Sequence, residues 1–211
     1  MNQGAKKKIA GVIGALVLPL TMMNIPAANA ADGLQWGPCP EAASAVKEAV
    51  CADFSVPKDY SNPQAGTITL TMSKIPAASG HARGTIAGNP GGPGGDALGM
   101  FAGDTSQDDH ADSRVTFPKN VRDNYDQIAV EPRGLAYGDP LTCEIEGIPA
   151  GLIGLNLAAG LSRELCNIAQ PGYMDTITTD NTARDLNEAR KQLGVNKLNL
   201  YGLSYGGLLM S

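Results

Sequence analysis

A glycine-flanked serine near the end of the printed chain is the clearest candidate for chemistry. The segment reads Gly202-Leu203-Ser204-Tyr205-Gly206-Gly207 and follows the short apolar run 198–201. G-x-S-x-G between a strand and a helix is typical of a nucleophile elbow, a strained turn that lifts the serine hydroxyl above a sheet. The residues two before and two after the serine must then lack side chains. The pattern predicts Ser204 as a nucleophile and the Tyr205 N–H as an oxyanion donor; a serine in an ordinary glycine turn is the alternative.

A second glycine-rich segment, Asn89-Pro90-Gly91-Gly92-Pro93-Gly94-Gly95, follows a predicted strand. Its prolines would stiffen the loop, and its glycines would let a substrate approach the backbone N–H groups. It could supply the other half of an oxyanion hole. A phosphate-binding loop requires G-x-x-x-x-G-K-[ST], and neither Lys nor Ser/Thr follows at those positions. A purely structural turn is the remaining alternative.

Short strands are expected to position both segments. Residues 67–75 alternate, with Ile68, Leu70 and Met72 on one face, which predicts a half-buried strand. Residues 83–89 predict a short strand that enters the glycine loop, and 126–131 predict a buried strand closed by Pro132. A last strand is expected over 198–201, where Gly202 turns the chain.

Helical periodicity is clearest over residues 182–193. Four apolar residues share one face there, namely Ala183, Leu186, Ala189 and Leu193. Thr179 or Asp180 can cap this helix, and Gly194 suits a left-handed stop. Residues 151–165 are interpreted as a core-packing helix or an insertion, and 104–114 as a solvated loop. Strands and helices thus alternate, which predicts an α/β fold with a mostly parallel sheet and crossover helices.

The first 30 residues have the pattern of a signal peptide. Lys6, Lys7 and Lys8 precede the apolar run 9–22, and Ala28-Asn29-Ala30 offers a cleavage site. The apolar run is too short for a membrane span, so no stable membrane anchor is expected after cleavage. We therefore expect a signal peptide at 1–30, a domain at 31–211 and a secreted, extracellular or cell-envelope location.

Export implies that the four cysteines pair. Three connectivities are possible, and the local one, Cys39–Cys51 with Cys143–Cys166, is the economical expectation. Zinc is disfavoured because the chain has no C-x-x-C pair and no histidine near these cysteines. No cofactor and no metal are expected.

Composition excludes several classes of protein. The chain has 211 residues, is 43% hydrophobic and 18% charged, and contains 26 glycines and 14 prolines, which is compatible with a globular protein. Its formal charge of −5 becomes −8 without the first 30 residues, since these carry three lysines and no acid. Nucleic acid is therefore not an expected partner.

Taken in order, the motifs resemble those of the secreted tripeptidyl and prolyl aminopeptidase-like branch of the α/β-hydrolases. The matching features are Trp36 and Cys39, Cys51-Ala52, Val56-Pro57-Lys58-Asp59-Tyr60, the glycine loop 89–95, Tyr125-Asp126, Pro132-Arg133-Gly134, Ala183 to Leu186 and the segment 202–207. The resemblance covers essentially the whole chain after residue 30. It implies an α/β-hydrolase fold and a serine hydrolase that cuts peptides near their amino terminus. It also implies Ser204 as the nucleophile, with Tyr205 and Gly92, or its neighbour Gly91, as oxyanion donors.

This sequence departs from the family pattern at three places. Glu131 stands where Asp is usual, residues 133–138 lack a Gly and a Ser, and Asp96 replaces a small polar residue. A carboxylate that pointed at an oxyanion would oppose it, so Asp96 is expected to turn to solvent.

The acid and histidine that should follow the nucleophile are not found after Ser204. His81 and His110 lie upstream in loop-like stretches and are interpreted as surface residues. The chain is therefore expected to be the N-terminal part of a longer hydrolase, truncated just after the elbow and with little activity alone. An esterase or lipase acting on ester substrates and a non-catalytic secreted remnant are the alternatives to a peptide-cleaving enzyme.

Overall fold

The computed structural model describes residues 33–104, 114–144 and 162–211. The described residues belong to one compact unit, Asp32–Ser211. The predicted signal peptide, His110, most of the 104–114 loop and most of the 151–165 segment lie outside the described residues.

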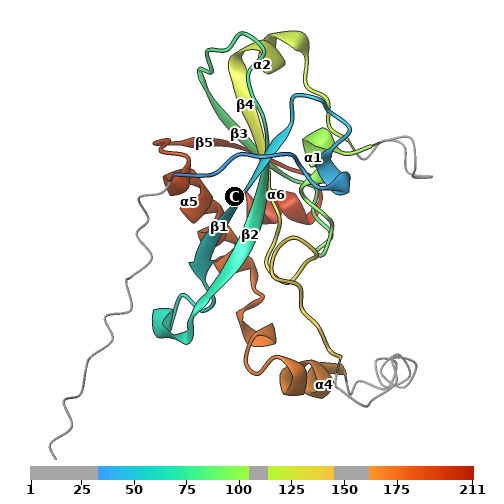
Figure 1. The fold of residues 1–211 in the computed structure, drawn as a ribbon, viewed down its shortest axis with the longest axis vertical. Coiled ribbons are helices and arrows are strands. Elements are labelled where there is room, and N and C mark those ends of the chain that lie inside the picture. Colours follow the sequence, from blue (N-terminus) through green and yellow to red (C-terminus); the bar gives the residue numbers. More distant parts are fainter. Residues whose placement is uncertain (1–32, 105–113, 145–161) are drawn as a thin grey trace, which may run out of the picture. The chain divides into compact units, whose positions relative to one another are not determined.

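A mixed five-stranded sheet in the order β1-β2-β4-β3-β5 forms the centre of this unit (Figure 1). Three predicted strands, β4, β3 and β5, form its parallel part. The glycine loop follows β3, and the serine turn follows β5. The strands β1 and β2 pair antiparallel with each other, and β2 pairs antiparallel with β4. The α/β fold is confirmed, but the described sheet is mixed and not mostly parallel as predicted. The reason is that β2 runs antiparallel to both of its neighbours, β4 and β1, and β1 was not predicted as a strand. The strands are β1 Val50–Pro57, β2 Thr67–Ile75, β3 Gly84–Asn89, β4 Tyr125–Val130 and β5 Leu198–Gly202.

Hydrophobic side chains cover both faces of the sheet. The alternation expected in β2 is confirmed, since Ile68, Leu70 and Met72 are buried in the largest core cluster together with Ile128 of β4. The neighbouring Ala129 points to the opposite face and packs with residues of α1. The sheet therefore has a core on each side, with α5 over one face and α1 over the other.

The helices are short except for α5. They are α1 Gly99–Ala102, α2 Lys119–Asn124, α4 Ser162–Ala169, α5 Thr179–Gln192 and α6 Tyr205–Leu209, with 3-10 turns at Glu41–Ala43, Pro63–Ala65 and Met174–Thr176. The start of α5 corrects the predicted cap, which was Thr179 or Asp180. Thr178 is the cap, because its backbone is extended and its hydroxyl accepts a hydrogen bond from the Asn181 N–H. The left-handed stop at Gly194 is confirmed by its φ of 69°.

Both expected disulfides are present. Cys39–Cys51 attaches the N-terminal segment to β1, where Gly37 and Cys51 also exchange two backbone hydrogen bonds of 2.8 and 2.9 Å. Cys143–Cys166 joins the segment that follows β4 to α4. The local connectivity is therefore confirmed.

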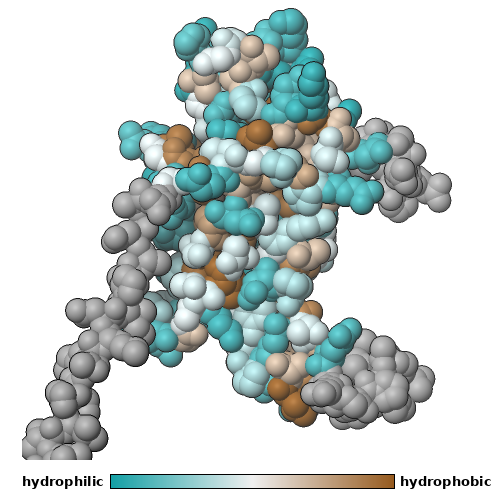
Figure 2. All heavy atoms as spheres, viewed as in Figure 1, coloured by the Kyte–Doolittle hydropathy of each residue, from teal (hydrophilic) through white to brown (hydrophobic). Residues whose placement is uncertain are grey.

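Hydrophobic residues on the surface are scattered. In the face drawn in Figure 2, they form small patches between hydrophilic ones. The exposed large hydrophobic residues among those described are Ile168, Leu200, Leu203 and Leu208. None of the described helices is both long and apolar enough to cross a bilayer.

Candidate active site

Ser204 occupies a strained turn between β5 and α6. Its φ and ψ are 50° and −125°, and it is one of two residues other than glycine that have a positive φ in the described chain. Such a conformation costs about 1–3 kcal/mol and persists only where the surrounding structure imposes it. The side chain is exposed at the end of β5 and makes no hydrogen bond with any described residue. The turn therefore presents a free hydroxyl, as the sequence pattern predicted.

The flanking glycines are required because backbone atoms crowd this turn. A Cβ at Gly202 would lie 2.2 Å from the carbonyl oxygen of Gly206. A Cβ at Gly206 would lie 2.2 Å from the carbonyl oxygen of Asn89, at the end of β3. Both distances are far below van der Waals contact, so no other residue type fits at either position without a backbone shift.

The glycine loop lies directly against this turn. Asn89 is paired with Gly202 in the parallel register of β3 and β5, and its carbonyl accepts the Leu203 N–H at 3.1 Å. The Cβ position of Gly91, at a φ of 96°, is 3.0 Å from the backbone nitrogen of Tyr205. Two segments more than 100 residues apart in sequence therefore meet beside Ser204.

The backbone N–H groups around Ser204 differ in what they can still bind. The Gly91 N–H donates to the Asn89 side chain at 2.9 Å. Within the described residues, no acceptor takes up the N–H of Gly92 or of Tyr205. Of the two glycines implied by the resemblance, Gly92 therefore has the more available donor.

The Tyr205 side chain connects the turn to the first residue of α5. Its hydroxyl forms a short hydrogen bond with the hydroxyl of Thr179. The nucleophile turn is thus linked by one hydrogen bond to the start of α5.

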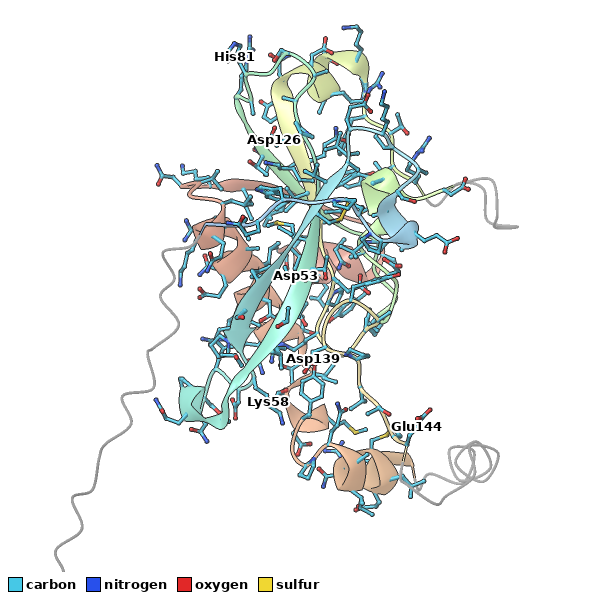
Figure 3. All side chains as sticks on the ribbon, viewed as in Figure 1. Asp53, Lys58, His81, Asp126, Asp139 and Glu144 are labelled. Atoms are coloured by element: carbon cyan, nitrogen blue, oxygen red, sulfur yellow. A yellow bond between two sulfur atoms is a disulfide. The ribbon has the colours of Figure 1, made fainter. Side chains whose placement is uncertain are left out.

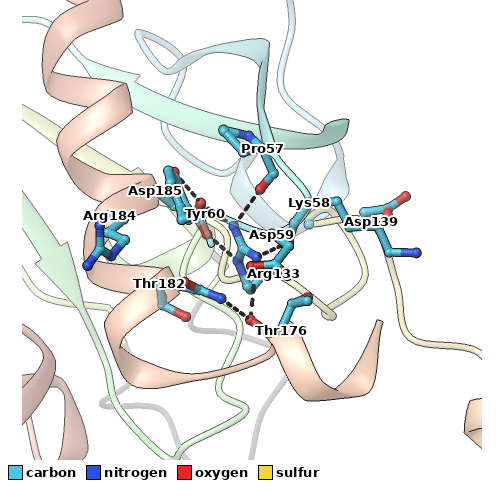
Figure 4. A network of polar contacts seen from close by, with 12 residues as sticks. Pro57, Lys58, Asp59, Tyr60, Arg133, Asp139, Thr176, Thr182, Arg184 and Asp185 are labelled. Atoms are coloured by element: carbon cyan, nitrogen blue, oxygen red, sulfur yellow. Dashed lines mark hydrogen bonds and ion pairs between the residues drawn. The ribbon is translucent and has the colours of Figure 1, made fainter. Parts of the chain in front are cut away.

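A buried ion pair holds α5 in place, and sequence reasoning missed it. Arg133 follows β4, and its guanidinium donates to Asp185 of α5 through two bonds of 2.7 and 2.6 Å. Both side chains are essentially inaccessible, at 0% and 1% exposure. The guanidinium also donates to the carbonyls of Pro57 and Lys58 at the end of β1, as Figure 4 shows. The motifs around both residues were noted, but their pairing across 52 positions had no signal in the sequence.

Tyr60 completes this cluster from the β1–β2 connection. Its hydroxyl donates to the Asp185 carboxylate at 2.9 Å. Burial, and then the negative charge of Asp185, raise the pKa of the Tyr60 hydroxyl well above its usual value. Tyr60 therefore stays a neutral donor over the whole physiological pH range.

The two carboxyl departures from the family pattern lie at the far end of the glycine loop. Glu131 is buried, and its Oε2 accepts from the N–H of Ala97 at 3.0 Å and of Leu98 at 3.4 Å. Asp96 is exposed and accepts the Gly99 N–H at 3.4 Å. It makes no hydrogen bond to Ser204, so the expectation that Asp96 turns to solvent is confirmed.

His81 does not reach the nucleophile. It is exposed and precedes Gly84, the residue that begins β3, whereas Ser204 lies beyond the other end of that strand. Figure 3 shows His81 near Asp126 at the end of the sheet where β3 and β4 begin. His110 lies outside the described residues. The described chain therefore brings together a serine and oxyanion donors without a histidine base.

Metal-ligating groups do not gather anywhere in the described chain. No set of three or more His, Cys, Asp or Glu side chains is arranged there to hold a metal ion.

Comparison with known proteins identifies relatives for most of this chain. The alpha/beta hydrolase fold family matches residues 89–211, which contain the glycine loop and the serine turn. Tripeptidyl aminopeptidase of Streptomyces coelicolor is 32% identical over 201 residues, covering 88% of this chain and 36% of that protein. Serine protease Hip1 of Mycobacterium tuberculosis (strain H37Rv) is 28% identical over 195 residues, covering 82% and 35%. Carboxylesterase B of the same organism is 28% identical over 174 residues, covering 74% and 32%. The chain spans about a third of the length of these relatives.

Proposed function

The chain belongs to the alpha/beta hydrolase family, and on that basis we propose that it is the nucleophile-bearing part of an exported serine hydrolase of aminopeptidase type. Such an enzyme releases short peptides or single residues from the free amino terminus of a peptide substrate. The relatives named tripeptidyl aminopeptidase and serine protease support the peptidase assignment. The two disulfides support export, because cysteines pair in oxidising compartments.

The observation that carries this proposal is the strained, exposed Ser204 beside two unoccupied N–H groups. In the proposed reaction the Ser204 Oγ attacks the scissile carbonyl carbon, and a base takes the hydroxyl proton. The carbonyl oxygen becomes an oxyanion that accepts hydrogen bonds from the Tyr205 and Gly92 N–H groups. Collapse of this intermediate breaks the C–N bond, and the base returns its proton to the leaving amine. Water then hydrolyses the acyl-enzyme and regenerates Ser204.

The base and the acid that orients it belong to polypeptide outside the described residues, in this proposal. Serine attack requires such a base, and His81 is at the wrong end of the sheet. The relatives are nearly three times as long as their aligned segment, so they have ample chain for both groups. Residues 31–211 would then be the N-terminal part of the hydrolase domain and would have little activity by themselves.

An ester substrate is the second candidate. The relatives named carboxylesterase B favour it, and an elbow with an oxyanion loop serves amide and ester cleavage equally. The two candidates differ in whether the substrate must carry a free α-amino group. A non-catalytic remnant would need neither.

The nucleophile assignment can be tested by labelling the purified chain with a fluorophosphonate while imidazole supplies the missing base. We expect imidazole-dependent labelling of Ser204, located by peptide mass spectrometry. Ser204→Ala should abolish it, and the matched control Ser211→Ala, which removes another exposed serine, should leave it unchanged. Equal labelling of the wild type and Ser204→Ala would contradict a nucleophilic Ser204 and favour the non-catalytic remnant.

Substrate class can be tested by comparing tripeptidyl arylamides that have a free amino terminus, their N-acetylated forms and short acyl esters. The polypeptide assayed should include any natural extension beyond Ser211. An aminopeptidase-type enzyme is expected to lose most of its kcat/KM on N-acetylation. Equal turnover of blocked and free substrates, with faster ester cleavage, would favour the esterase. Rapid arylamide turnover by residues 1–211 alone, lost in Ser204→Ala, would contradict the proposal that the base lies elsewhere.

A further inference from the structure

We propose that Glu131 and Asp96 share a single proton, and that this carboxyl pair positions the glycine loop beside Ser204. Glu131 is a positioning residue in this scheme, because it touches neither substrate nor Ser204. The catalytic consequence rests on the function proposed above, whereas the shared proton itself does not.

The two carboxyl groups hold three consecutive backbone amides at the end of the glycine loop. Glu131 Oε2 accepts from the N–H groups of Ala97 and Leu98 at 3.0 and 3.4 Å. Asp96 Oδ1 accepts from the next N–H, that of Gly99, at 3.4 Å. Glu131 itself is fixed at the end of β4, where its own N–H donates to the Thr71 carbonyl at 3.0 Å. The loop is thus attached to the sheet at its far end through one buried carboxyl group.

The second oxygen of Glu131 shows that a donor is required. Oε1 is buried, has no hydrogen-bond partner among the described residues, and belongs to a side chain that is 1% exposed. Asp96 directly precedes the two residues whose N–H groups donate to Glu131, and its negative charge acts on the Glu131 carboxyl group. Two carboxylates cannot donate to each other, and a buried oxygen left without a donor destabilises the fold. One proton between the two groups satisfies Oε1 and removes one of the two adjacent negative charges.

No other described group can replace this proton. Arg133 is two residues away, but its guanidinium is directed to Asp185 of α5. Asp185 borders the same small cavity as Glu131, and the ion pair with Arg133 neutralises its charge. The α1 segment, Gly99–Ala102, carries no charge. Among the charged groups, Asp96 has the largest effect on the Glu131 carboxyl.

Solvent protons can reach the pair through Asp96. Asp96 lines a surface pocket of about 490 Å³ together with Pro90, Gly99 and Glu41. Burial and the neighbouring Asp96 charge raise the pKa of Glu131 to about 7. Glu131 is therefore expected to hold a proton in mildly acidic solution and to release it as the pH passes neutrality.

Release of the proton should loosen the loop at the end opposite the nucleophile. The loop is attached to the serine turn through the bond between Asn89 and Leu203, and to β4 through Glu131. Two adjacent negative charges would push Asp96 outward and weaken the bonds to the Ala97 and Leu98 N–H groups. The Gly91 and Gly92 backbone between these attachments would then lose its defined position beside Tyr205.

Hydrogen–deuterium exchange of the full chain tests the shared proton directly. The readout is the protection factor of peptides that cover 95–99, measured from about pH 5 to about pH 9 and corrected for intrinsic exchange. We expect wild-type protection to fall about tenfold as the pH passes neutrality, equivalent to one hydrogen bond of about 1.4 kcal/mol. Asp96→Asn and Glu131→Gln each provide a permanent amide donor, so their protection should be independent of pH. Asp126→Asn is the matched control, since that carboxyl caps the Ala77 N–H at the other end of β4.

Positioning is tested by the ratio of Ser204 labelling rates in the wild type and Asp96→Asn, with imidazole present in both. The wild-type rate divided by the Asp96→Asn rate should fall above neutral pH if the pair positions the loop. The pH dependence of imidazole cancels in this ratio, because imidazole is present in both reactions. Unchanged wild-type protection across this range, or the same pH response in Asp96→Asn, would overturn the proposal and indicate a water or cation on Oε1. Ser204→Ala should retain the exchange response. If Ser204 is not labelled but the exchange response is as expected, only the proposed function is contradicted. If Ser204 is labelled but the ratio of rates does not change with pH, only the positioning role is contradicted.

Discussion

Replacing Asp185 with Asn should destabilise the fold far more than the same change five residues earlier in the same helix, at Asp180. Asp185→Asn keeps the shape of the side chain but leaves the Arg133 guanidinium buried without its counter-charge. Asp180 also pairs with an arginine, Arg184, at 2.8 Å, but those side chains are 74% and 55% exposed. The two substitutions remove the same charge from α5 and differ mainly in the burial of the partner.

The expected magnitudes follow from that difference. Two unit charges about 4 Å apart attract by about 4 kcal/mol at an effective dielectric constant of 20, and breaking one side of a buried pair costs about 3–5 kcal/mol. The Arg133 guanidinium keeps its bonds to the Pro57 and Lys58 carbonyls, so we expect the lower end, about 3 kcal/mol. An exposed i,i+4 pair contributes about 0.3–0.5 kcal/mol, so Asp180→Asn should cost no more than that.

Urea unfolding followed by circular dichroism measures both values. The midpoint should shift clearly for Asp185→Asn and barely for Asp180→Asn, with unchanged slopes. Arg133→Met, Asp185→Leu and their double variant form a double-mutant cycle, in which the double variant should recover part of the loss seen in each single variant. Equal midpoints for Asp185→Asn and Asp180→Asn would refute the claim that the buried pair anchors α5. If Asp185→Asn does not fold, the same comparison with Arg133→Lys keeps the test decisive, because Lys retains the charge and loses the bidentate geometry.

Three further outcomes are expected. Gly206→Ala should lower the free energy of unfolding by about 1–3 kcal/mol and displace the turn, because its Cβ would meet the Asn89 carbonyl. A Cβ at Gly207 meets nothing within 4 Å, so Gly207→Ala should be neutral or stabilising. Thermal unfolding compares the two variants, and equal effects would contradict the crowding at Gly206. Removing either disulfide, by Cys39→Ser with Cys51→Ser or by Cys143→Ser with Cys166→Ser, should lower the free energy of unfolding by about 3 kcal/mol. Urea unfolding measures this loss, and an unchanged free energy would show that the closed loop does not constrain the unfolded chain. The folded state raises the pKa of Glu131 from 4.5 to about 7, so the native chain holds a proton that the unfolded chain releases in this window. The free energy of unfolding, measured with urea, should therefore fall from pH 4.5 to about 7 and level off above it, and an equal slope in Asp96→Asn would contradict a contribution of Asp96.

Local features of the chain could be predicted because their signals lie close together in sequence. Strand β2 has the predicted bounds, since the alternation of Ile68, Leu70 and Met72 is complete within nine residues. The serine turn is likewise defined by six consecutive residues whose glycines have no steric alternative. Each cysteine pairs with a near neighbour, so the economical choice of loop was sufficient.

The start of α5 and strand β1 show where local signals end. The sequence predicted Thr179 or Asp180 as the cap, and only the extended backbone at Thr178 shows that the preceding threonine is the cap. Strand β1 alternates in its burial but ends at Pro57 and was noticed only for its motif. Its role as an antiparallel edge strand depends on pairing with β2.

The sequence by itself determined the nucleophile turn, the glycine loop, the family pattern and the local cysteine pairs. Only the tertiary structure decided which charges are buried and with whom. Asp185 lies in a helix whose other charges face water, and Glu131 follows a strand in which nothing indicates a carboxyl partner. Their partners are 52 and about 35 positions away, and chain topology alone brings them together. The energy of a charge depends on the dielectric and the hydrogen-bond donors around it, which a sequence pattern does not contain.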